Sequence, residues 1–323
     1  MAHHVTLIPG DWIGPETCAV AQEVIAATGV DIVWDEHECG PIPHEALLAS
    51  CRHNKVILKA KVAAPREVGH LPPTIELRKQ LGLWATVRPI QTLPNVGARF
   101  EDLDILVIRE TSEDIYSGFE HEVTSGVYEA VKVTTRTAVE RIARFAFERA
   151  RELGRSKVTI VHKSNIMKKS DGLFLSTAQE VALAYPDIET DEVIVDALCM
   201  RLVKNPRVFD VLLTLNLFGD IVSDLCSGLA GGIVASPSAS FGGGIAMFEN
   251  PHGKVPELVG TGLANPIPMI RTAVMMLEHL SERDAAHRLM RALVVACESG
   301  LHTVDRGGTD GCRRVADAVI AAL

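Results

Sequence analysis

The sequence predicts an α/β fold, because short apolar strands alternate with stretches whose apolar residues recur at helical spacing. The first strand, residues 5–9, ends in a turn that contains Gly10 and Gly14, and a helix then extends to about Ala27. The same unit recurs. Further strands are expected at residues 32–34, 105–108, 158–161, 193–195 and 211–215, and further helices at residues 137–153 and 171–184.

Two segments depart from this alternation. Residues 127–134 alternate apolar and polar side chains beside Gly126, which predicts an antiparallel ribbon that could serve dimerisation. Residues 231–244 are rich in Gly, Ser and Pro, have little helical or strand pattern, and are expected to lie between two domains. A chain of 323 residues can bury one large core or two moderate ones.

The composition narrows the possible partners and compartments. The formal charge of -9, from 41 acidic and 32 basic side chains, disfavours binding to nucleic acid. No apolar stretch approaches the roughly 20 residues that span a bilayer, and the first residues lack a signal-peptide pattern, so a cytoplasmic protein without a membrane partner is expected. The seven cysteines form no CxxC pair and are interpreted as reduced thiols.

A pair of aspartates follows the strand at residues 211–215. Asp220 and Asp224 fall one turn apart at the start of a predicted helix, where two like charges repel. A divalent cation would relieve that repulsion, since carboxylate oxygens are hard ligands. Two solvated aspartates in a first helical turn are the ordinary alternative.

A lysine follows the strand at residues 158–161, at a carboxyl end where α/β proteins tend to place their sites. Beside a metal and a charged substrate, Lys163 could take a proton from a hydroxyl group, with Asn165 close by in sequence. An ordinary surface lysine in the basic run with Lys168 and Lys169 is the alternative.

Three arginines could bind a polycarboxylate, because guanidinium groups bind carboxylates through two parallel hydrogen bonds. These are Arg78, Arg88 and Arg109, and the last of them ends the strand at residues 105–108. Tyr116 follows soon after and would bring a phenol near the same strand end. Taken alone, Arg78 could equally be a helix-surface residue, and a lone tyrosine is more often a packing residue than an acid.

A loop at residues 248–266 is a candidate nucleotide-binding edge. It contains a His-Gly turn at His252 and Gly253, and Asn265 precedes a proline. No strand is followed by the GxGxxG pattern of a Rossmann fold, so a dinucleotide would have to bind in another way.

Together and in this order, these clusters resemble the β-decarboxylating dehydrogenases, the family of isocitrate, homoisocitrate and isopropylmalate dehydrogenases. The likeness spans nearly the whole chain and is strongest to the NAD-dependent isocitrate enzymes. It is carried by residues 116–121 (YSGFEH), 161–167 (VHKSNIM) and 216–224 (NLFGDIVSD). The resemblance implies an isocitrate/isopropylmalate dehydrogenase-like fold of two α/β domains that is not a Rossmann fold.

The resemblance also assigns roles to individual residues. It implies that the arginines and Thr74 and Asn165 bind the substrate, that Tyr116 and Lys163 are acid and base, and that Asp196, Asp220 and Asp224 bind Mg²⁺ or Mn²⁺. His252, Gly253, Glu257 and Asn265 match the loop that binds NAD.

The family's architecture implies a homodimer with shared active sites, in which Lys163 and Asp196 reach into the partner's site. A large cofactor-binding domain is expected at residues 1–97 and 241–323, and a small domain with the dimerisation arm at residues 98–240. The implied reaction is NAD-dependent and metal-dependent oxidative decarboxylation of a 3-substituted (R)-malate.

Some positions depart from the family pattern. Trp12 stands where the first turn usually has glycine, and Ala64 replaces a cofactor-side threonine. The substrate loop carries Leu71, Pro72, Thr74 and Ile75, which match neither the Ser and Asn of isocitrate enzymes nor the Glu and Leu residues of isopropylmalate enzymes.

The substrate therefore stays open at the level of sequence. Isocitrate or homoisocitrate is favoured, with 3-isopropylmalate or another malate analogue, such as malate, tartrate or a phosphonate, as alternatives. An alternative of another class is a non-catalytic regulatory subunit, which would not need to retain every acid, base and metal position.

Overall fold

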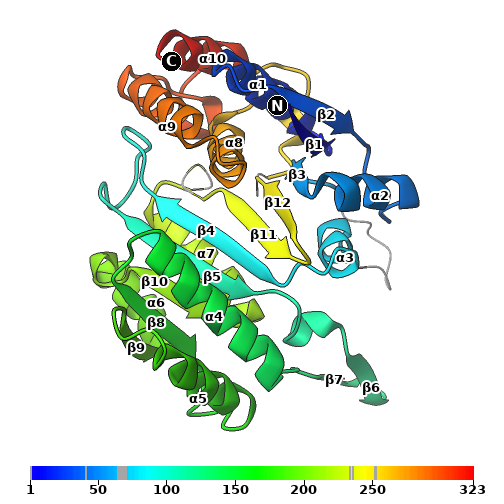
Figure 1. The fold of residues 1–323 in the computed structure, drawn as a ribbon, viewed down its shortest axis with the longest axis vertical. Helices are drawn as coiled ribbons and strands as arrows, with labels where there is room; N and C mark the ends of the chain where they lie inside the picture. Colours follow the sequence, from blue (N-terminus) through cyan, green and yellow to red (C-terminus); the bar gives the residue numbers. More distant parts are fainter. Residues whose placement is uncertain (1, 41, 64–70, 233, 235, 251–252) are drawn as a thin grey trace. The chain divides into compact units, whose positions relative to one another are not determined.

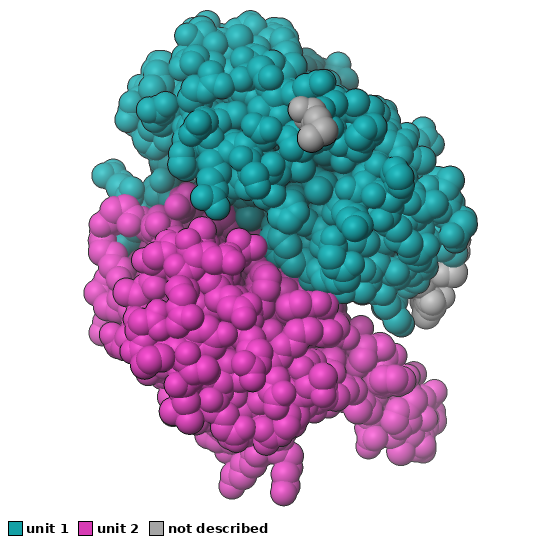
Figure 2. Space-filling model, in the orientation of Figure 1, with its two compact units in different colours: residues 1–83, 92–101, 230–323 teal, residues 84–91, 102–229 magenta. Residues whose placement is uncertain are grey.

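A computed structural model describes residues 2–40, 42–63, 71–232, 234, 236–250 and 253–323 (Figure 1). The chain divides into two compact units, drawn in different colours in Figure 2. Unit 1 comprises Met1–Leu83, Thr92–Glu101 and Ala230–Leu323, and unit 2 comprises Trp84–Gln91 and Asp102–Leu229.

Unit 1 contains a mostly parallel sheet in the strand order β2-β1-β3-β12-β11. Its strands are β1 (His3–Ile8), β2 (Ile32–Glu36), β3 (Val56–Lys59), β11 (Ser238–Gly242) and β12 (Ile245–Glu249). Its helices are α1 (Gly14–Ala27), α2 (Glu45–Asn54), α3 (Pro73–Gln80), α8 (Ile267–His279), α9 (Arg283–Glu298) and α10 (Cys312–Ala321), with 3₁₀ turns η4 (Pro256–Leu258) and η5 (Val304–Arg306). Only β11 runs antiparallel to its neighbour β12.

Apolar side chains cover both faces of this sheet. On one face, α1, α8, α9 and α10 pack into a single core with strand residues such as Leu7 and Phe248. On the other face, Leu47 of α2 and Leu77 of α3 pack against Ile8 and Ile57. Unit 1 is therefore a three-layer α/β/α structure.

The sheet strands of unit 2 are also mostly parallel and follow the order β4-β5-β10-β8-β9. Its strands are β4 (Ala85–Gln91), β5 (Asp104–Glu110), β8 (Lys157–His162), β9 (Glu189–Ile194) and β10 (Val211–Thr214). Its helices are α4 (Arg136–Glu152), α5 (Ser170–Ala182), α6 (Val195–Lys204) and α7 (Asn216–Leu229), with 3₁₀ turns η1 (Ile115–Ser117) and η2 (Pro206–Val208).

Helices cover the strands of unit 2 as well. Helix α4 packs on β5 and β8 beside α5, and α7 packs on β4 and β5 beside α6. A separate hairpin of β6 (Glu120–Thr124) and β7 (Val127–Ala130) is antiparallel, and all its residues are exposed. Its two strands are visible beyond the body of unit 2 in Figure 1.

The predicted alternation of strands and helices is confirmed, and so is the antiparallel ribbon beside Gly126, although its second strand ends at Ala130 and not at Thr134. Two further details differ. The segment at residues 231–244 contains β11, whose small side chains are mostly buried between neighbours, so it is not merely a connection. Val195 begins α6 and does not extend a strand. None of the described helices has both the length and the apolar character to cross a bilayer.

Candidate active site

Arg88 and Arg109, two of the predicted substrate-binding residues, lie on neighbouring strands of unit 2. In the antiparallel ladder of β4 and β5, Thr86 pairs with Arg109 and Arg88 pairs with Val107, so the two arginines are diagonal neighbours on one face. Only 10% of the Arg88 side chain and 5% of the Arg109 side chain are exposed. Within the described residues, Arg88 Nε has no hydrogen-bond partner, which leaves a buried donor for an anion.

Asp220 and Asp224 lie one turn apart on α7, as predicted, and both contact these arginines. Arg109 donates a hydrogen bond to Asp220, and Arg88 Nη1 donates to Asp224 Oδ1 at 2.8 Å. Burial alone would raise the pKa of Asp220, but the charge of Arg109 and the hydrogen bond from Tyr116 outweigh burial and lower that pKa. The Asp220 carboxylate is therefore ionised at neutral pH.

Helix α7 approaches β5 closely because residue 219 is glycine. A Cβ on Gly219 would lie 2.3 Å from Thr214 Oγ1 and 2.6 Å from Arg109 Cγ. The absence of a side chain lets the first turn of α7 reach the arginine side chain. The glycine of the 216–224 motif thus sets the geometry between Asp220 and Arg109.

Asn216 and Ser223 complete this cluster, although neither is among the predicted site residues. Asn216 Oδ1 accepts hydrogen bonds from Arg109 Nε at 2.9 Å and from Nη2 at 2.6 Å. Ser223 Oγ accepts one from Arg88 Nη1 at 2.7 Å. Both residues fall within the 216–224 motif, but which arginine each one contacts depends on the folded chain.

Tyr116, the predicted acid, lies in the η1 turn beside the same carboxylate. Its Oη donates to Asp220 Oδ2 at 2.9 Å, and the Arg109 guanidinium lies 5.2 Å from the centre of its ring. Burial raises the pKa of Tyr116, and the hydrogen bond to Asp220 adds to that effect, while the charge of Arg109 opposes it. The phenol therefore keeps its proton at neutral pH and can donate it.

Lys163, the predicted base, follows the end of β8 and forms an ion pair with Asp196 at the start of α6. The hydrogen bond from Lys163 lowers the pKa of Asp196. The Lys163 side chain is 26% exposed and that of Asp196 is 68% exposed, and Asn165 is also exposed. In the described part of the chain, neither Lys163 nor Asp196 forms a hydrogen bond or ion pair with Tyr116 or Asp220.

The metal ligands are consequently brought together only in part. Among the described residues, no group of three or more His, Cys, Asp or Glu side chains could hold a metal ion. Asp220 and Asp224 form one pair of hard oxygen donors, which fits a divalent cation, and Asp196 lies separately with Lys163.

Arg78, the third arginine, lies in unit 1 on α3, one turn after Thr74. It donates a hydrogen bond to Glu249, whose carboxylate also accepts one from the buried Lys59 at 3.1 Å. The Nε of Arg78 is buried and, within the described chain, has no hydrogen-bond partner. Arg78 is thus fixed in orientation and keeps one donor for a ligand. Ala64, the position that departs from the family's cofactor-side threonine, lies outside the described residues.

The predicted cofactor loop follows β12 in unit 1, and His252 lies outside the described residues. Gly253 is partly buried, and Glu257 is exposed in the η4 turn. Asn265 Nδ2 donates to Asp305 Oδ2 at 3.0 Å, and its Oδ1 accepts from a backbone N–H in the first turn of α8 at 3.0 Å. Asn265 thereby joins this loop to the η5 turn.

Trp12 adopts a backbone conformation that favours glycine, with φ of 55°. Its ring lies 5.6 Å from the Lys254 ammonium, which is a cation–π contact. Val255, which follows Lys254 in the chain, also has a positive φ, of 38°, and this conformation is strained for a β-branched side chain. The departure at Trp12 therefore creates a direct contact between the first turn and the predicted cofactor loop.

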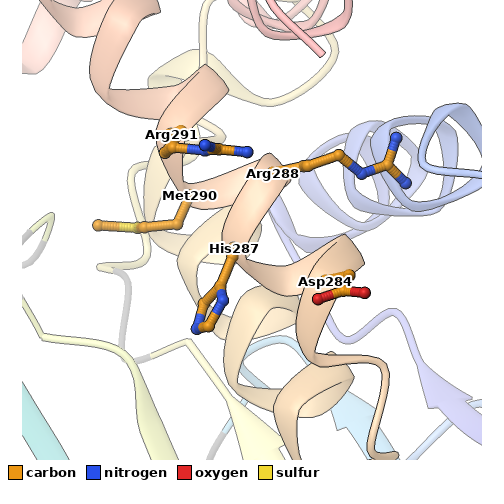
Figure 3. A pocket seen from close by; sticks show the side chains of 5 residues that line it. All are labelled: Asp284, His287, Arg288, Met290 and Arg291. Atoms are coloured by element: carbon orange, nitrogen blue, oxygen red, sulfur yellow. The ribbon is translucent and has the colours of Figure 1, made fainter.

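Two hollows lie on unit 1, and the second of them is lined by Asp305, the hydrogen-bond partner of Asn265. The first runs along α9, where the labelled side chains in Figure 3 project in different directions from a single helix: Asp284, His287, Arg288, Met290 and Arg291. The second has a volume of about 480 Å³, and its described lining comes from residues 95–97, 231, 232, 234, 302, 305 and 306. Neither contains a predicted site residue.

The chain belongs to the isocitrate/isopropylmalate dehydrogenase family, whose sequence model matches residues 4–319. It is therefore an oxidoreductase of a family that carries out oxidative decarboxylation. This result confirms the resemblance drawn from the three motifs and the α/β fold that it implies.

Three relatives illustrate how far the likeness extends. The chain is 45% identical over 314 residues to the mitochondrial NAD isocitrate dehydrogenase catalytic subunit 5 of Arabidopsis thaliana, covering 94% of this chain and 84% of the relative. It is also 45% identical over 304 residues to the chloroplastic 3-isopropylmalate dehydrogenase of Solanum tuberosum, covering 91% and 85%. The crystal structure of isocitrate dehydrogenase from Methylococcus capsulatus matches with a TM-score of 0.94 and 41% identity over 99% of each chain.

Equal identity to an isocitrate and an isopropylmalate enzyme leaves the substrate to be decided by the site. The two plant relatives are named as organelle proteins, so the cytoplasmic location of this chain stays a prediction.

Proposed function

We propose that this chain uses NAD and Mg²⁺ or Mn²⁺ to oxidise and decarboxylate a 3-substituted (R)-malate, with isocitrate or homoisocitrate favoured. The observation that carries the proposal is the cluster of Arg88, Arg109, Tyr116, Asp220 and Asp224, in which two cations, a protonated phenol and two carboxylates converge. This set suits a substrate with several carboxylates and a reacting carbon that must receive a proton.

The arginines would orient the substrate. Arg88 Nε is a buried donor without a hydrogen-bond partner in the described chain, and a substrate carboxylate would satisfy it. Asn216 and Ser223 hold the guanidinium groups in place, so the two arginine side chains would lose little conformational freedom when substrate binds.

Asp220, Asp224 and Asp196 would hold the divalent cation, which when bound supplies Lewis-acid polarisation of the substrate's hydroxyl and carboxylate oxygens. The predicted loop with Gly253, Glu257 and Asn265 would hold NAD, which would supply the acceptor for the hydride of C2. Lys163 would take the proton of the 2-hydroxyl group, and Tyr116 would deliver a proton to C3 after CO₂ leaves. The position of the protonated Tyr116 phenol beside Asp220, at 2.9 Å, supports its role as the proton donor.

The grouping of these residues supports a homodimer with shared sites. Lys163 and Asp196 contact each other, and in the described chain they form no hydrogen bond or ion pair with Tyr116 or Asp220. We propose that a second copy supplies Lys163 and Asp196 to the site that holds Tyr116 and Asp220.

The substrate is tested with a panel of 3-substituted malates ranked by kcat/KM. The predicted substrate segment before Arg78 has Leu71 and Pro72 ahead of α3 and Thr74 and Ile75 in the first turn of that helix. These four residues are mostly apolar, and none of them is a cation that could pair with a third carboxylate. We expect the preference for isocitrate over 3-isopropylmalate to be weaker than a dedicated isocitrate pocket would give. A strong and exclusive preference for isocitrate would contradict this role of the loop.

The cofactor preference is tested by kcat/KM with NAD and NADP at saturating metal. Glu257 is an exposed carboxylate that can accept hydrogen bonds from ribose hydroxyls and would repel a 2′-phosphate. The nearest cation in sequence, Lys254, contacts Trp12. Equal values for the two nucleotides would refute the placement of Glu257 at the ribose.

The metal is tested by turnover of the purified chain with EDTA, and then with Mn²⁺ added back. Loss and recovery of activity are expected, and Asp224→Asn should weaken Mn²⁺ binding. The same assay addresses the non-catalytic subunit, because substantial turnover by the chain alone excludes that alternative.

A further inference from the structure

Lys132 lies between two buried carboxylates of unit 2. Its ammonium is 2.9 Å from Asp171 Oδ1, 3.6 Å from Asp114 Oδ1 and 5.0 Å from the centre of the Phe218 ring. The Lys132 side chain is 15% exposed, and the two aspartates are 0% and 1% exposed. Neither aspartate nor this lysine has a role in the chemistry proposed above.

Asp171 fixes the backbone of Lys163, the predicted base. Its Oδ2 accepts a hydrogen bond from the Lys163 N–H at 2.7 Å. Its Oδ1 is buried and, in the described chain, accepts no hydrogen bond, so the Lys132 charge compensates this end of the carboxylate. Without that charge, a buried carboxylate would be poorly satisfied.

Asp114 fixes the backbone next to Tyr116, the predicted acid, and at the start of α7, which carries the predicted metal ligands Asp220 and Asp224. Its Oδ2 accepts from the Leu217 N–H at 2.9 Å, in the first turn of the helix that carries Asp220. Its Oδ1 accepts from the Ile115 N–H at 2.9 Å, directly before Tyr116. Asp114 also has a positive φ of 74°, so tertiary contacts must maintain its conformation.

We propose that Lys132 is a positioning residue that holds Asp171 and Asp114 together, and thereby fixes Lys163 relative to Tyr116 and α7. This inference rests on the proposed function, in which those two groups serve different active sites of a dimer. In each subunit, Lys132 then links two parts of the machinery. One is Lys163, the base that this subunit donates to its partner's site, and the other is the acid and the metal ligands of the subunit's own site.

The first test measures amide hydrogen exchange in Lys132→Met, without metal, substrate or cofactor. Loss of the ammonium should loosen both aspartates, so exchange at the Lys163 and Leu217 amides should accelerate about tenfold or more. Lys157→Met is the matched control, because Lys157 also joins two acids of unit 2, at 3.1 Å from Glu189 and 2.8 Å from Asp191. Unchanged exchange at both amides in Lys132→Met would overturn the proposal.

Two further variants keep the test decisive if Lys132→Met does not fold. Lys132→Arg retains the charge and should restore slow exchange and most of kcat, with KM for NAD unchanged. Lys132→Met combined with Asp171→Asn removes the uncompensated charge and should fold, yet keep the fast exchange at Leu217. Slow exchange at Leu217 in this double variant would overturn the link to α7.

Mixed dimers test the coupling of the two sites. A dimer of one Lys163→Met subunit and one Asp220→Asn subunit should contain one intact shared site and reach up to half of the wild-type turnover. Lys132→Met should lower that turnover whichever subunit carries it. In the subunit that donates Lys163 it disturbs that lysine, and in the other subunit it disturbs Tyr116. An effect on one subunit alone would overturn the coupling, whereas failure of the mixed dimers to recover activity would refute the shared site and leave the exchange result to decide the role of Lys132.

Discussion

At the scale of single residues, the chemistry of Tyr116 depends on the carboxylate and guanidinium that face it. Burial and the hydrogen bond to Asp220 raise its pKa, and Arg109 lowers it, with a net upward shift. A phenol with a raised pKa stays protonated over a wider pH range, but it is also a weaker acid than a phenol whose pKa lies near neutral pH.

This shift can be measured by absorbance titration of phenolate. The difference between wild type and Tyr116→Phe isolates one phenol, and its midpoint should lie above the ordinary value of about 10. Asp220→Asn should lower the midpoint, because it removes a negative charge that disfavours phenolate. A midpoint at or below the ordinary value would contradict the arrangement around Tyr116.

Lys163 can be separated from neighbouring lysines by substitution. Lys163→Met should lower kcat by about 10²–10⁴, because it removes a general base, while leaving NAD binding and the thermal midpoint close to wild type. Lys168→Met, an exposed lysine of the same segment, should have little effect on kcat. Similar kcat values for the two variants would exclude Lys163 as the base.

At the scale of elements, the packing of α7 on β5 carries the site. Gly219→Ala would place a methyl group 2.3 Å from Thr214 Oγ1, which should displace the helix from Arg109. Overpacking of this kind costs about 1–3 kcal/mol, and activity should fall because Asp220 and Asp224 move with the helix.

Gly228→Ala is the control on the same helix, since a Cβ there meets nothing within 4 Å. It should stabilise the protein by about 0.5–1 kcal/mol, because alanine is the better helix former. Urea unfolding and kcat of both variants give the comparison. A stabilised and fully active Gly219→Ala protein would show that the close approach is not required.

The elements differ in how far the sequence reveals them. Strands such as β5 and β10 are continuous apolar runs, so a single chain is enough to predict them. Strand β4 contains Arg88 and Pro89, and β11 consists largely of small residues, so neither shows a strand pattern. Their burial depends on partners distant in sequence, such as Ser223 for Arg88.

The same reasoning applies to the site. Motifs that match a known family identify Asp220, Tyr116 and Lys163. Lys132 and Asp171 carry no such signal, because the role of each depends on a charge that only the fold brings near.

At the scale of the whole molecule, the exposed hairpin of β6 and β7 needs a covering partner. Phe119 is 62% exposed and Tyr128 is 65% exposed, and an isolated two-stranded sheet is at best marginally stable in water. We expect the hairpin to pack against a second copy of the chain, as the predicted dimerisation arm would.

Sedimentation equilibrium measures this directly. The wild-type chain should have twice the chain mass of 34.9 kDa, and Tyr128→Asp should weaken the dimer. Turnover should fall in parallel with dissociation, because each site would need two chains. A monomer with full activity would refute both the arm's role and the shared site.

The two ends of the chain meet in one sheet and one core. Strands β1 to β3 precede Leu83, whereas β11 and β12 and the helices that cover them follow Ala230. A ribosome that has just added Leu229 has therefore made all of unit 2, while β3 still lacks its neighbour β12. We expect unit 2 to fold first although it begins later in the chain. The N-terminal strands must meanwhile remain with an open edge, which makes them the segment of the nascent protein most in need of a chaperone.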